Sequence, residues 1–328
     1  MIKLLLNLKK RLYFYVFVDF IIALIIGYYF DFSRINIKPF GIAAVFIMLY
    51  PMLTGMVIEK VKKAGRNFKL IITTLTFAYF IASITAFIIS RTVLKSFPEI
   101  AFAMVMVGAI PCSNMLIGWS GIADASVEDA LVIAVIGLFL IPVLSPLLLK
   151  LSGGVFISFK IKTLAMLLLS YIIIPLIMGL ITRHIIIKKR GMKYFMEIKK
   201  IFPGISALGI LMIIFFSVAK VSKIVIKKPV IFLIVFIGLF LYYLLQTSFS
   251  LFAAKLLNLK YEQGMILILG ATASSQAISL SVAATMFPAL TVFALSFKPV
   301  LQVIYIMFLI YGMGPFLKKF LGEKNKSQ

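Results

Sequence analysis

The chain has 328 residues, of which 63% are hydrophobic and 13% are charged, and its mean hydropathy is +1.14. These values lie far outside the averages of soluble proteins, so we interpret the chain as a polytopic membrane protein and exclude most classes of soluble enzyme. The single cysteine, Cys112, permits no intramolecular disulfide, and the single histidine, His184, cannot anchor a zinc site of Cys and His ligands. We therefore expect no bound metal and no cofactor.

Apolar runs of roughly 20 residues, the length that crosses a bilayer as a helix, recur along the whole chain and leave no segment for a soluble domain. In chain order they predict ten transmembrane spans, at 13–30, 39–58, 70–90, 100–120, 130–149, 163–182, 204–222, 229–254, 264–286 and 289–316. The predicted fold class is therefore all-α, with residues 1–328 in a single transmembrane domain. The first run resembles a signal peptide, but Tyr28-Tyr29-Phe30 stands where small residues would mark cleavage, so we expect an uncleaved first span.

Positive charge is distributed unevenly between the predicted loops. Of the 34 Lys and Arg residues, 22 fall on the side of the N-terminus and 11 on the opposite side. Cytoplasmic loops of membrane proteins carry an excess of Lys and Arg, so we predict a multi-pass protein of the plasma membrane with both termini in the cytoplasm. The net charge of +24 is then explained by topology and by attraction to anionic lipid, and nucleic acid is not an expected partner.

The ten predicted spans divide into two sets of five. Because five is odd, the second set enters the membrane upside down, which makes 1–150 and 151–328 two inverted repeats. Polar and helix-disrupting residues gather near the middle of two equivalent spans, the fourth and the ninth: Gly108, Pro111, Cys112, Ser113, Asn114, and Gly270, Thr272, Ser274, Ser275, Gln276. Irregular backbone at this depth requires protein or a water-filled cavity around it, so we expect broken, crossing helices and one polar cavity. The alternative is that these small and hydroxyl residues only pack helices together.

Motifs in the second and fourth spans are arranged as in a known family. Tyr50-Pro51 ends the second span just before a basic loop, and Pro111-Cys112, Met115 and Trp119-Ser120 follow one another in the fourth. In this pattern the chain resembles the arsenite efflux permeases, which belong to the bile acid:sodium symporter superfamily of ten-span transporters. The Ser113-Asn114 pair looks like the sodium-coupled bile acid branch, in which a Ser-Asn at this place supplies oxygen ligands to sodium.

Charged residues differ from the pattern of that family at two places. The arsenite permeases carry a glutamate in the ninth span, where this chain has Ile278 or Ser279. They carry a second glutamate after a Gly-Pro in the tenth span, where Lys298 takes the place of the glycine and Gln302 that of the acid. One acid is therefore lost from each of these spans, and a base is gained in the tenth.

The polar clusters offer two kinds of ligand chemistry. The resemblance implies that Cys112 binds trivalent arsenic, which prefers a soft thiolate to oxygen or nitrogen, whereas a buried cysteine that only fills space is the alternative. Oxygen atoms and hydrogen-bond donors for a hard cation, an oxyanion or a neutral trihydroxide come from Ser113, Asn114, Ser275 and Gln276. Hydrogen bonds between helices are the alternative role of these four side chains.

Two ionisable residues, Lys298 and Asp19, lie well inside predicted spans. An ammonium at the depth of Lys298 needs an acid, carbonyl groups or an anion, so we interpret it as the partner of an anionic substrate or as a fixed cation where a relative binds sodium. If the tenth span begins later, Lys298 lies near the outer surface instead. Asp19 and Gln302 are candidate coupling or charge partners, and an interfacial position is the alternative for Asp19.

Together these patterns predict a secondary transporter that works by alternating access, and not an enzyme. The resemblance implies efflux of arsenite or a related metalloid oxyanion, and the alternative is a sodium- or proton-coupled symporter of a bile acid-like organic anion. The expected partners are a small anionic or metalloid substrate, Na⁺ or H⁺ as coupling ion, and the lipid bilayer. A remote alternative is a rhomboid-like intramembrane protease, because Gly118-Trp119-Ser120-Gly121 fits the motif G-x-S-G and His184 is available as a base.

Overall fold

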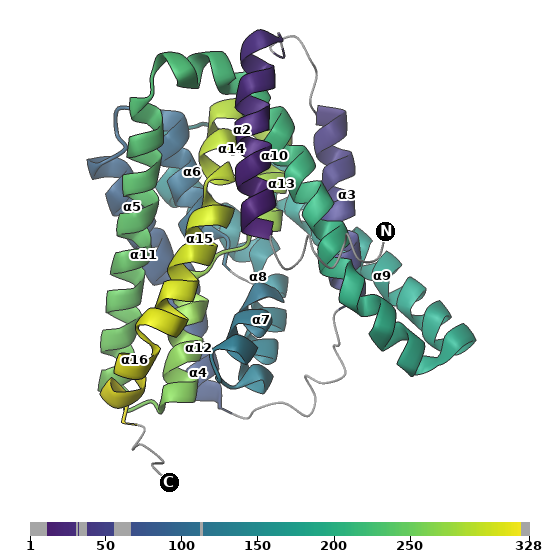
Figure 1. Ribbon diagram of the computed structural model, residues 1–328. Coiled ribbons are helices and arrows are strands. Elements are labelled where there is room, and N and C mark those ends of the chain that lie inside the picture. The colour runs from purple at the N-terminus through teal and green to yellow at the C-terminus, as the bar shows by residue number, and fades with distance from the viewer. Residues whose placement is uncertain (1–11, 31, 33–37, 56–66, 112–113, 323–328) are drawn as a thin grey trace. The chain divides into compact units, whose positions relative to one another are not determined.

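The computed structural model describes residues 12–30, 32, 38–55, 67–111 and 114–322, apart from a few side chains inside helices, that of Asn114 among them. Within these ranges every regular element is a helix and no strand is present (Figure 1). This confirms the all-α fold class.

Helices coincide with the predicted apolar runs. Five single helices each cover one run: α2 (Leu12–Tyr29), α3 (Lys38–Thr54), α8 (Val127–Gly153), α10 (Phe202–Lys227) and α11 (Val230–Leu256). The third run is covered by α4 (Phe68–Thr76), the π-helix η2 (Phe77–Ile81) and α5 (Ala82–Thr92), which follow one another without a gap.

The remaining runs are divided between shorter helices. The fourth run holds α6 (Pro98–Ala109) and α7 (Asn114–Ile122), and the ninth holds α12 (Tyr261–Thr272) and α13 (Gln276–Met286). The last run holds α14 (Ala289–Ser296), α15 (Lys298–Met307), the π-helix η4 (Phe308–Gly312) and α16 (Gly314–Phe320). Both runs in which polar residues predicted a broken helix are thus interrupted.

Helix α9 (Ile161–Ile198) covers the sixth run and extends beyond it. Gly191 has φ +80° and ψ 165°, a conformation that glycine adopts without the steric cost of a side chain, and it kinks α9 there. The short η3 (Lys199–Ile201) then joins α9 to α10. The apolar stretch Ile161–Lys227 has 67 residues, more than twice the roughly 20 that one crossing needs.

Five stretches among the described residues are long and apolar enough to cross a membrane: Phe68–Thr92, Val127–Gly153, Ile161–Lys227, Val230–Leu256 and Ala289–Gly312. Shorter apolar helices lie at Phe14–Tyr29, Pro98–Ala109 and Gln276–Met286. The chain is therefore an integral membrane protein.

The chain forms two compact units. Unit 1 comprises 1–56, 162–233 and 276–300, and unit 2 comprises 57–161, 234–275 and 301–328. Each unit takes segments from both sides of residue 150, so residues far apart in the sequence pack within one unit.

In unit 1, α10 lies alongside α2, α3 and α14, and α13 packs against α3 and α14 (Figure 1). Small residues permit this close approach, because a Cβ added to Gly27 of α2 would lie 2.3 Å from the carbonyl oxygen of Ala219 in α10. Four aromatic rings also pack together from different parts of unit 1: Phe20, Phe232, Phe293 and Phe297.

In unit 2, α5 and α6 form an antiparallel hairpin, α6 packs against α8, and α12 packs against α4 and α7. The hairpin is close because a Cβ on Gly108 would lie 2.4 Å from the carbonyl oxygen of Ala82. A hydrogen bond joins η2 to α8, because the hydroxyl of Tyr79 donates to the carbonyl oxygen of Gly137 over 2.6 Å.

Candidate functional site

The two interruptions of unit 2 lie side by side. Pro111, just after α6, pairs with Ser274, just after α12, in an isolated antiparallel bridge. The backbone N–H of Ser275 donates to the carbonyl oxygen of Ile110 over 3.1 Å. Backbone N–H and C=O groups inside a membrane protein need hydrogen-bond partners within the protein. Here the two extended segments provide such partners for each other.

Hydroxyl groups satisfy the end of α6. Ser145 of α8 donates its Oγ–H to the carbonyl oxygen of Ala109 over 2.6 Å, and Ser83 of α5 donates to that of Gly108 over 3.4 Å. The last carbonyls of a helix have no partner within the helix, so these contacts stabilise the broken end. Cys112 and Ser113, which follow this end, lie outside the described residues, and the side chain of Asn114 is not described.

Gln302 connects α15 to the interruption after α12. Its Oε1 accepts the backbone N–H of Ser274 over 3.3 Å, and the side chain is fully buried. Its Nε2 and the Oγ of Ser274 have no hydrogen-bond partner among the described residues. A neutral amide with a free donor therefore occupies the place where the resemblance implied an acid.

A polar stripe on α11 was not predicted from the sequence. It consists of Tyr243, Gln246, Thr247 and Ser250, which share one helix face by their spacing and are all buried. The hydroxyl of Tyr305 donates to the Oγ1 of Thr247 over 3.0 Å, and that Oγ1 lies 3.4 Å from the Oγ1 of Thr272. The spacing of these polar residues inside an apolar run was the signal that would have revealed the stripe.

Part of this stripe is unsatisfied. Both amide atoms of Gln246 and the hydroxyl of Tyr243 are buried without a hydrogen-bond partner in the part of the chain that the structure describes. A buried polar group without a partner costs about 1–3 kcal/mol, so such groups call for a bound water, an ion or a second conformation that satisfies them.

Unit 1 holds Lys298, whose side chain is 1% exposed and whose Nζ donates to the Oγ of Ser279 over 3.0 Å. The side chain is therefore enclosed by protein, and the depth of Lys298 in the membrane stays a prediction. Gln276 precedes Ser279 by one turn of α13, is 3% exposed, and has neither amide atom hydrogen-bonded within the described residues. Unit 1 thus presents an ammonium, a hydroxyl and an unpaired amide from α13 and the start of α15.

Asp19 is half-buried on α2, next to Phe20 of the aromatic cluster. Its Oδ2 is inaccessible to solvent and has no hydrogen-bond partner among the described residues. Of the predicted site residues, unit 1 contains Asp19, Gln276 and Lys298, and unit 2 contains Ser275 and Gln302.

No feature of Ser120 suits a nucleophile. Its side chain is fully buried, and its hydroxyl donates to the carbonyl oxygen of Leu116 in its own helix over 2.7 Å. His184 is exposed on α9. The residues that the structure describes also contain no group of three or more His, Cys, Asp or Glu that would hold a metal ion.

Sequence comparison places the chain in a class of membrane transporter. The model of the Sodium Bile acid symporter family matches residues 42–228, more than half of the chain, and the chain belongs to this family. It is also similar to the arsenical-resistance protein Acr3 of Alkaliphilus metalliredigens (strain QYMF), with 25% identity over 222 residues. That match covers 64% of this chain and 61% of the relative, so the chain spans about three fifths of the length of the relative that it matches.

These comparisons confirm the resemblance that the motifs of the second and fourth spans indicated. Membership of a symporter family also supports the expectation that the chain is not an enzyme.

Proposed function

We propose that this protein is a secondary active transporter that exports arsenite or a related metalloid oxyanion by alternating access. The observation that carries the proposal is the pair of interrupted helices, α6/α7 and α12/α13, whose extended segments meet at Pro111 and Ser274. Interrupted helices near the middle of a membrane are where secondary transporters bind substrate and coupling ion. Membership of the Sodium Bile acid symporter family and the similarity to an arsenical-resistance protein support this function.

For the topology we propose ten spans in the plasma membrane, built as inverted repeats 1–150 and 151–328 with both termini in the cytoplasm. The coincidence of helices with all ten apolar runs supports the count. The positions of the two interruptions, in the fourth and ninth runs, support the repeat, because these runs are equivalent in two sets of five.

We propose that the metalloid binds at the interruption between α6 and α7. In the sequence this interruption contains Cys112, which carries the single thiol of the 328 residues. A thiolate is the softest donor available to a trivalent arsenic atom, and capture by one thiolate is weak enough to permit release. Hydrogen bonds to the hydroxyl groups of the substrate are then assigned to the other polar residues predicted from the sequence: Ser113, Asn114, Ser275 and Gln276.

We propose that the positive charge of Lys298 opposes the binding of a sodium ion. Its ammonium is buried beside Ser279, so it acts as a fixed cation where a sodium-coupled relative binds an ion. At an effective dielectric constant near 20, two unit charges about 4 Å apart repel by roughly 4 kcal/mol. Bound sodium is therefore disfavoured near Lys298, and transport proceeds without a sodium gradient.

The second candidate function is symport of an organic anion with sodium or a proton. The buried ammonium of Lys298 favours it, because an ammonium with a hydroxyl and an amide nearby is a suitable partner for a carboxylate or sulfonate. This function does not need Cys112, so the effect of replacing Cys112 separates the two functions.

A growth assay in a host that lacks its own transporters separates the two functions. Expression of the unaltered chain should restore growth in arsenite or antimonite, and everted membrane vesicles should accumulate arsenite when energised. Growth that stays sensitive to both metalloids, together with uptake of a radiolabelled bile acid, would reject metalloid export and establish the second function.

A further inference from the structure

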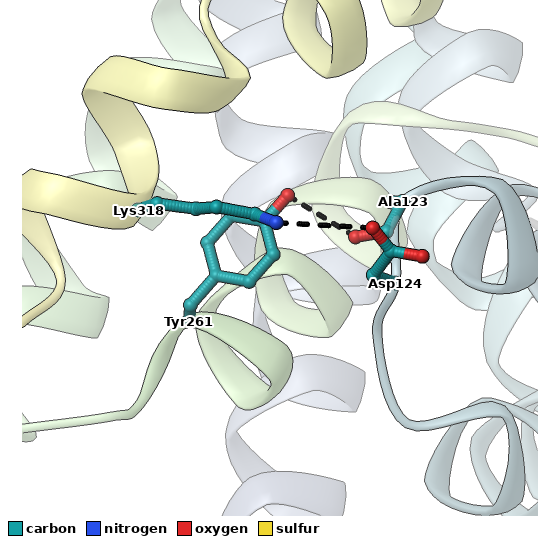
Figure 2. A network of polar contacts seen from close by, with 4 residues as sticks. All are labelled: Ala123, Asp124, Tyr261 and Lys318. Carbon is teal, nitrogen blue, oxygen red and sulfur yellow. Dashed lines mark hydrogen bonds and ion pairs between the residues drawn. The ribbon is translucent and has the colours of Figure 1, made fainter. Parts of the chain in front are cut away.

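Unit 2 contains a cleft that the transport proposal does not use. It has a volume of about 840 Å³ and is formed by the turn after α7, the start of α12, and the segment from η4 to α16. Figure 2 shows its polar contacts: the hydroxyl of Tyr261 donates to the carbonyl oxygen of Ala123 over 3.1 Å, and the Nζ of Lys318 lies 3.8 Å from the Oδ2 of Asp124. The same Nζ lies 5.0 Å from the centre of the Tyr261 ring.

The lining of the cleft contains both basic and apolar residues. Lys318 and the exposed Lys319 stand on α16, whereas Ile310, Tyr311 and Pro315 form the apolar wall. Next to this wall the chain presents exposed aromatic side chains, with Phe308, Tyr311 and Phe316 all more than half exposed. Aromatic rings followed by lysines at the end of an apolar run are typical of the boundary between lipid and water.

We propose that this cleft binds the headgroup of an anionic phospholipid, with its phosphate at Lys318 and Lys319. A volume of about 840 Å³ accommodates a headgroup but not two acyl chains, so the chains must lie outside, along the exposed face of Phe308 and Tyr311. Lysine binds phosphate as a point charge through charge-assisted hydrogen bonds, which are stronger than neutral ones. The two lysines then contact the phosphate, and the apolar residues of the lining contact the glycerol and the first methylene groups.

Asp124 competes with the phosphate for Lys318. The Asp124–Lys318 pair is long, and its side chains are 80% and 43% exposed, which makes it a weak surface ion pair. Asp124 has φ +52°, a left-handed conformation that Asp tolerates better than most residues, and the turn after α7 thereby holds the carboxylate beside the cleft. A bound phosphate takes Lys318 from Asp124 and leaves the Tyr261–Ala123 hydrogen bond in place.

The test measures lipid binding to the purified full chain by native mass spectrometry and by thermal unfolding in detergent. We expect phosphatidylglycerol to bind and to raise the unfolding temperature more than phosphatidylcholine does. The double variant Lys318→Gln and Lys319→Gln should weaken phosphatidylglycerol binding about tenfold, because two charged donors are lost. Lys193→Gln, an exposed lysine of α9 in unit 1, is the matched control and should bind like the unaltered protein.

Asp124→Asn gives the sharper result because the proposal predicts a gain. Removal of the competing carboxylate should tighten phosphatidylglycerol binding, whereas a purely structural ion pair predicts no gain in lipid affinity. Equal binding of the two lipids, an unaffected double lysine variant, or weaker binding by Asp124→Asn would each overturn the proposal. Stabilisation by inorganic phosphate as large as that by phosphatidylglycerol would overturn it too, because the ligand would then be a free anion.

Discussion

The Nζ of Lys298 donates a hydrogen bond to the Oγ of Ser279 over 3.0 Å, and the lysine side chain is 1% exposed. In the pattern of the arsenite permeases these two positions correspond to a glycine and to a glutamate or its neighbour. By this resemblance, the chain carries a positive charge at Lys298 and no acid at Ile278 or Ser279. An internal ammonium inside a membrane protein is expensive, and residues of this kind mark functional sites.

Lys298 is predicted to make transport independent of sodium. A repulsion of roughly 4 kcal/mol at about 4 Å corresponds to nearly three orders of magnitude in sodium affinity. In proteoliposomes, transport rates should be equal with sodium or choline outside, and Lys298→Met should lower transport while the folded yield stays the same.

Lys223→Met is the control for this change, because Lys223 is an exposed residue of α10. It should transport like the unaltered protein. Strong stimulation of the unaltered protein by sodium would contradict the assigned role, as would a Lys298→Met variant with normal transport.

Cys112 is predicted to be essential for metalloid export. Cys112→Ser replaces the soft sulfur with a hard oxygen at nearly constant size, so arsenite resistance should be lost while the amount of protein in the membrane is unchanged. Growth in graded arsenite, with immunoblots of membrane fractions, measures both quantities. Full resistance in the variant would remove the thiol from the mechanism and favour the organic anion.

Gln246 is predicted to serve transport at the expense of stability. Because both of its amide atoms are buried without hydrogen-bond partners in the described part of the chain, Gln246→Met should stabilise the protein by about 1–3 kcal/mol. The transport rate should fall, since the amide would no longer bind water, an ion or substrate during the cycle. Unfolding in detergent and vesicle transport measure the two effects.

Ser248→Ala is the control for Gln246→Met, because Ser248 is exposed on the same helix and its hydroxyl donates to its own backbone, at the carbonyl oxygen of Leu244. It should change neither stability nor transport by a measurable amount. A destabilised Gln246→Met would show that the amide has a partner in the resting state.

Ser145 is predicted to stabilise the broken end of α6. Ser145→Ala removes the donor to the carbonyl oxygen of Ala109 and should lower the free energy of unfolding by about 1–3 kcal/mol, because a buried carbonyl loses its partner. Ser170→Ala removes an exposed hydroxyl that bonds only within its own helix, and should leave stability unchanged. Equal unfolding temperatures for both variants would mean that the contact contributes nothing.

The topology is predicted to place both termini and the connection between the sixth and seventh predicted spans, 183–203, in the cytoplasm. Reporter fusions after residues 65, 195 and 328 should all give a cytoplasmic signal. An external signal from the fusion after 195 would be incompatible with the inverted repeat. Six predicted spans, an even number, precede residue 195, so they must return the chain to the side of the N-terminus.

The class of protein and the positions of the helices could be predicted from the sequence. Length and apolarity of a run are local properties, and a bilayer of fixed thickness selects runs of about 20 residues whatever their neighbours are. The interruptions near Pro111 and Ser274 were also predictable, since proline and clustered polar residues weaken a helix in lipid. The family resemblance rested on equally local motifs, such as Tyr50-Pro51 and Pro111-Cys112.

Which polar groups contact one another could not be predicted from the sequence and follows from the packing of the helices. The bridge between Pro111 and Ser274, the contact of Lys298 with Ser279, and the cleft that holds Asp124 and Lys318 all join residues that belong to different helices or turns. Gln246 belongs to a polar stretch inside an apolar run, and packing within unit 2 buries its amide without a hydrogen-bond partner among the described residues. Such pairings depend on how helices pack, and packing is set by the shape of many side chains at once and not by any local pattern.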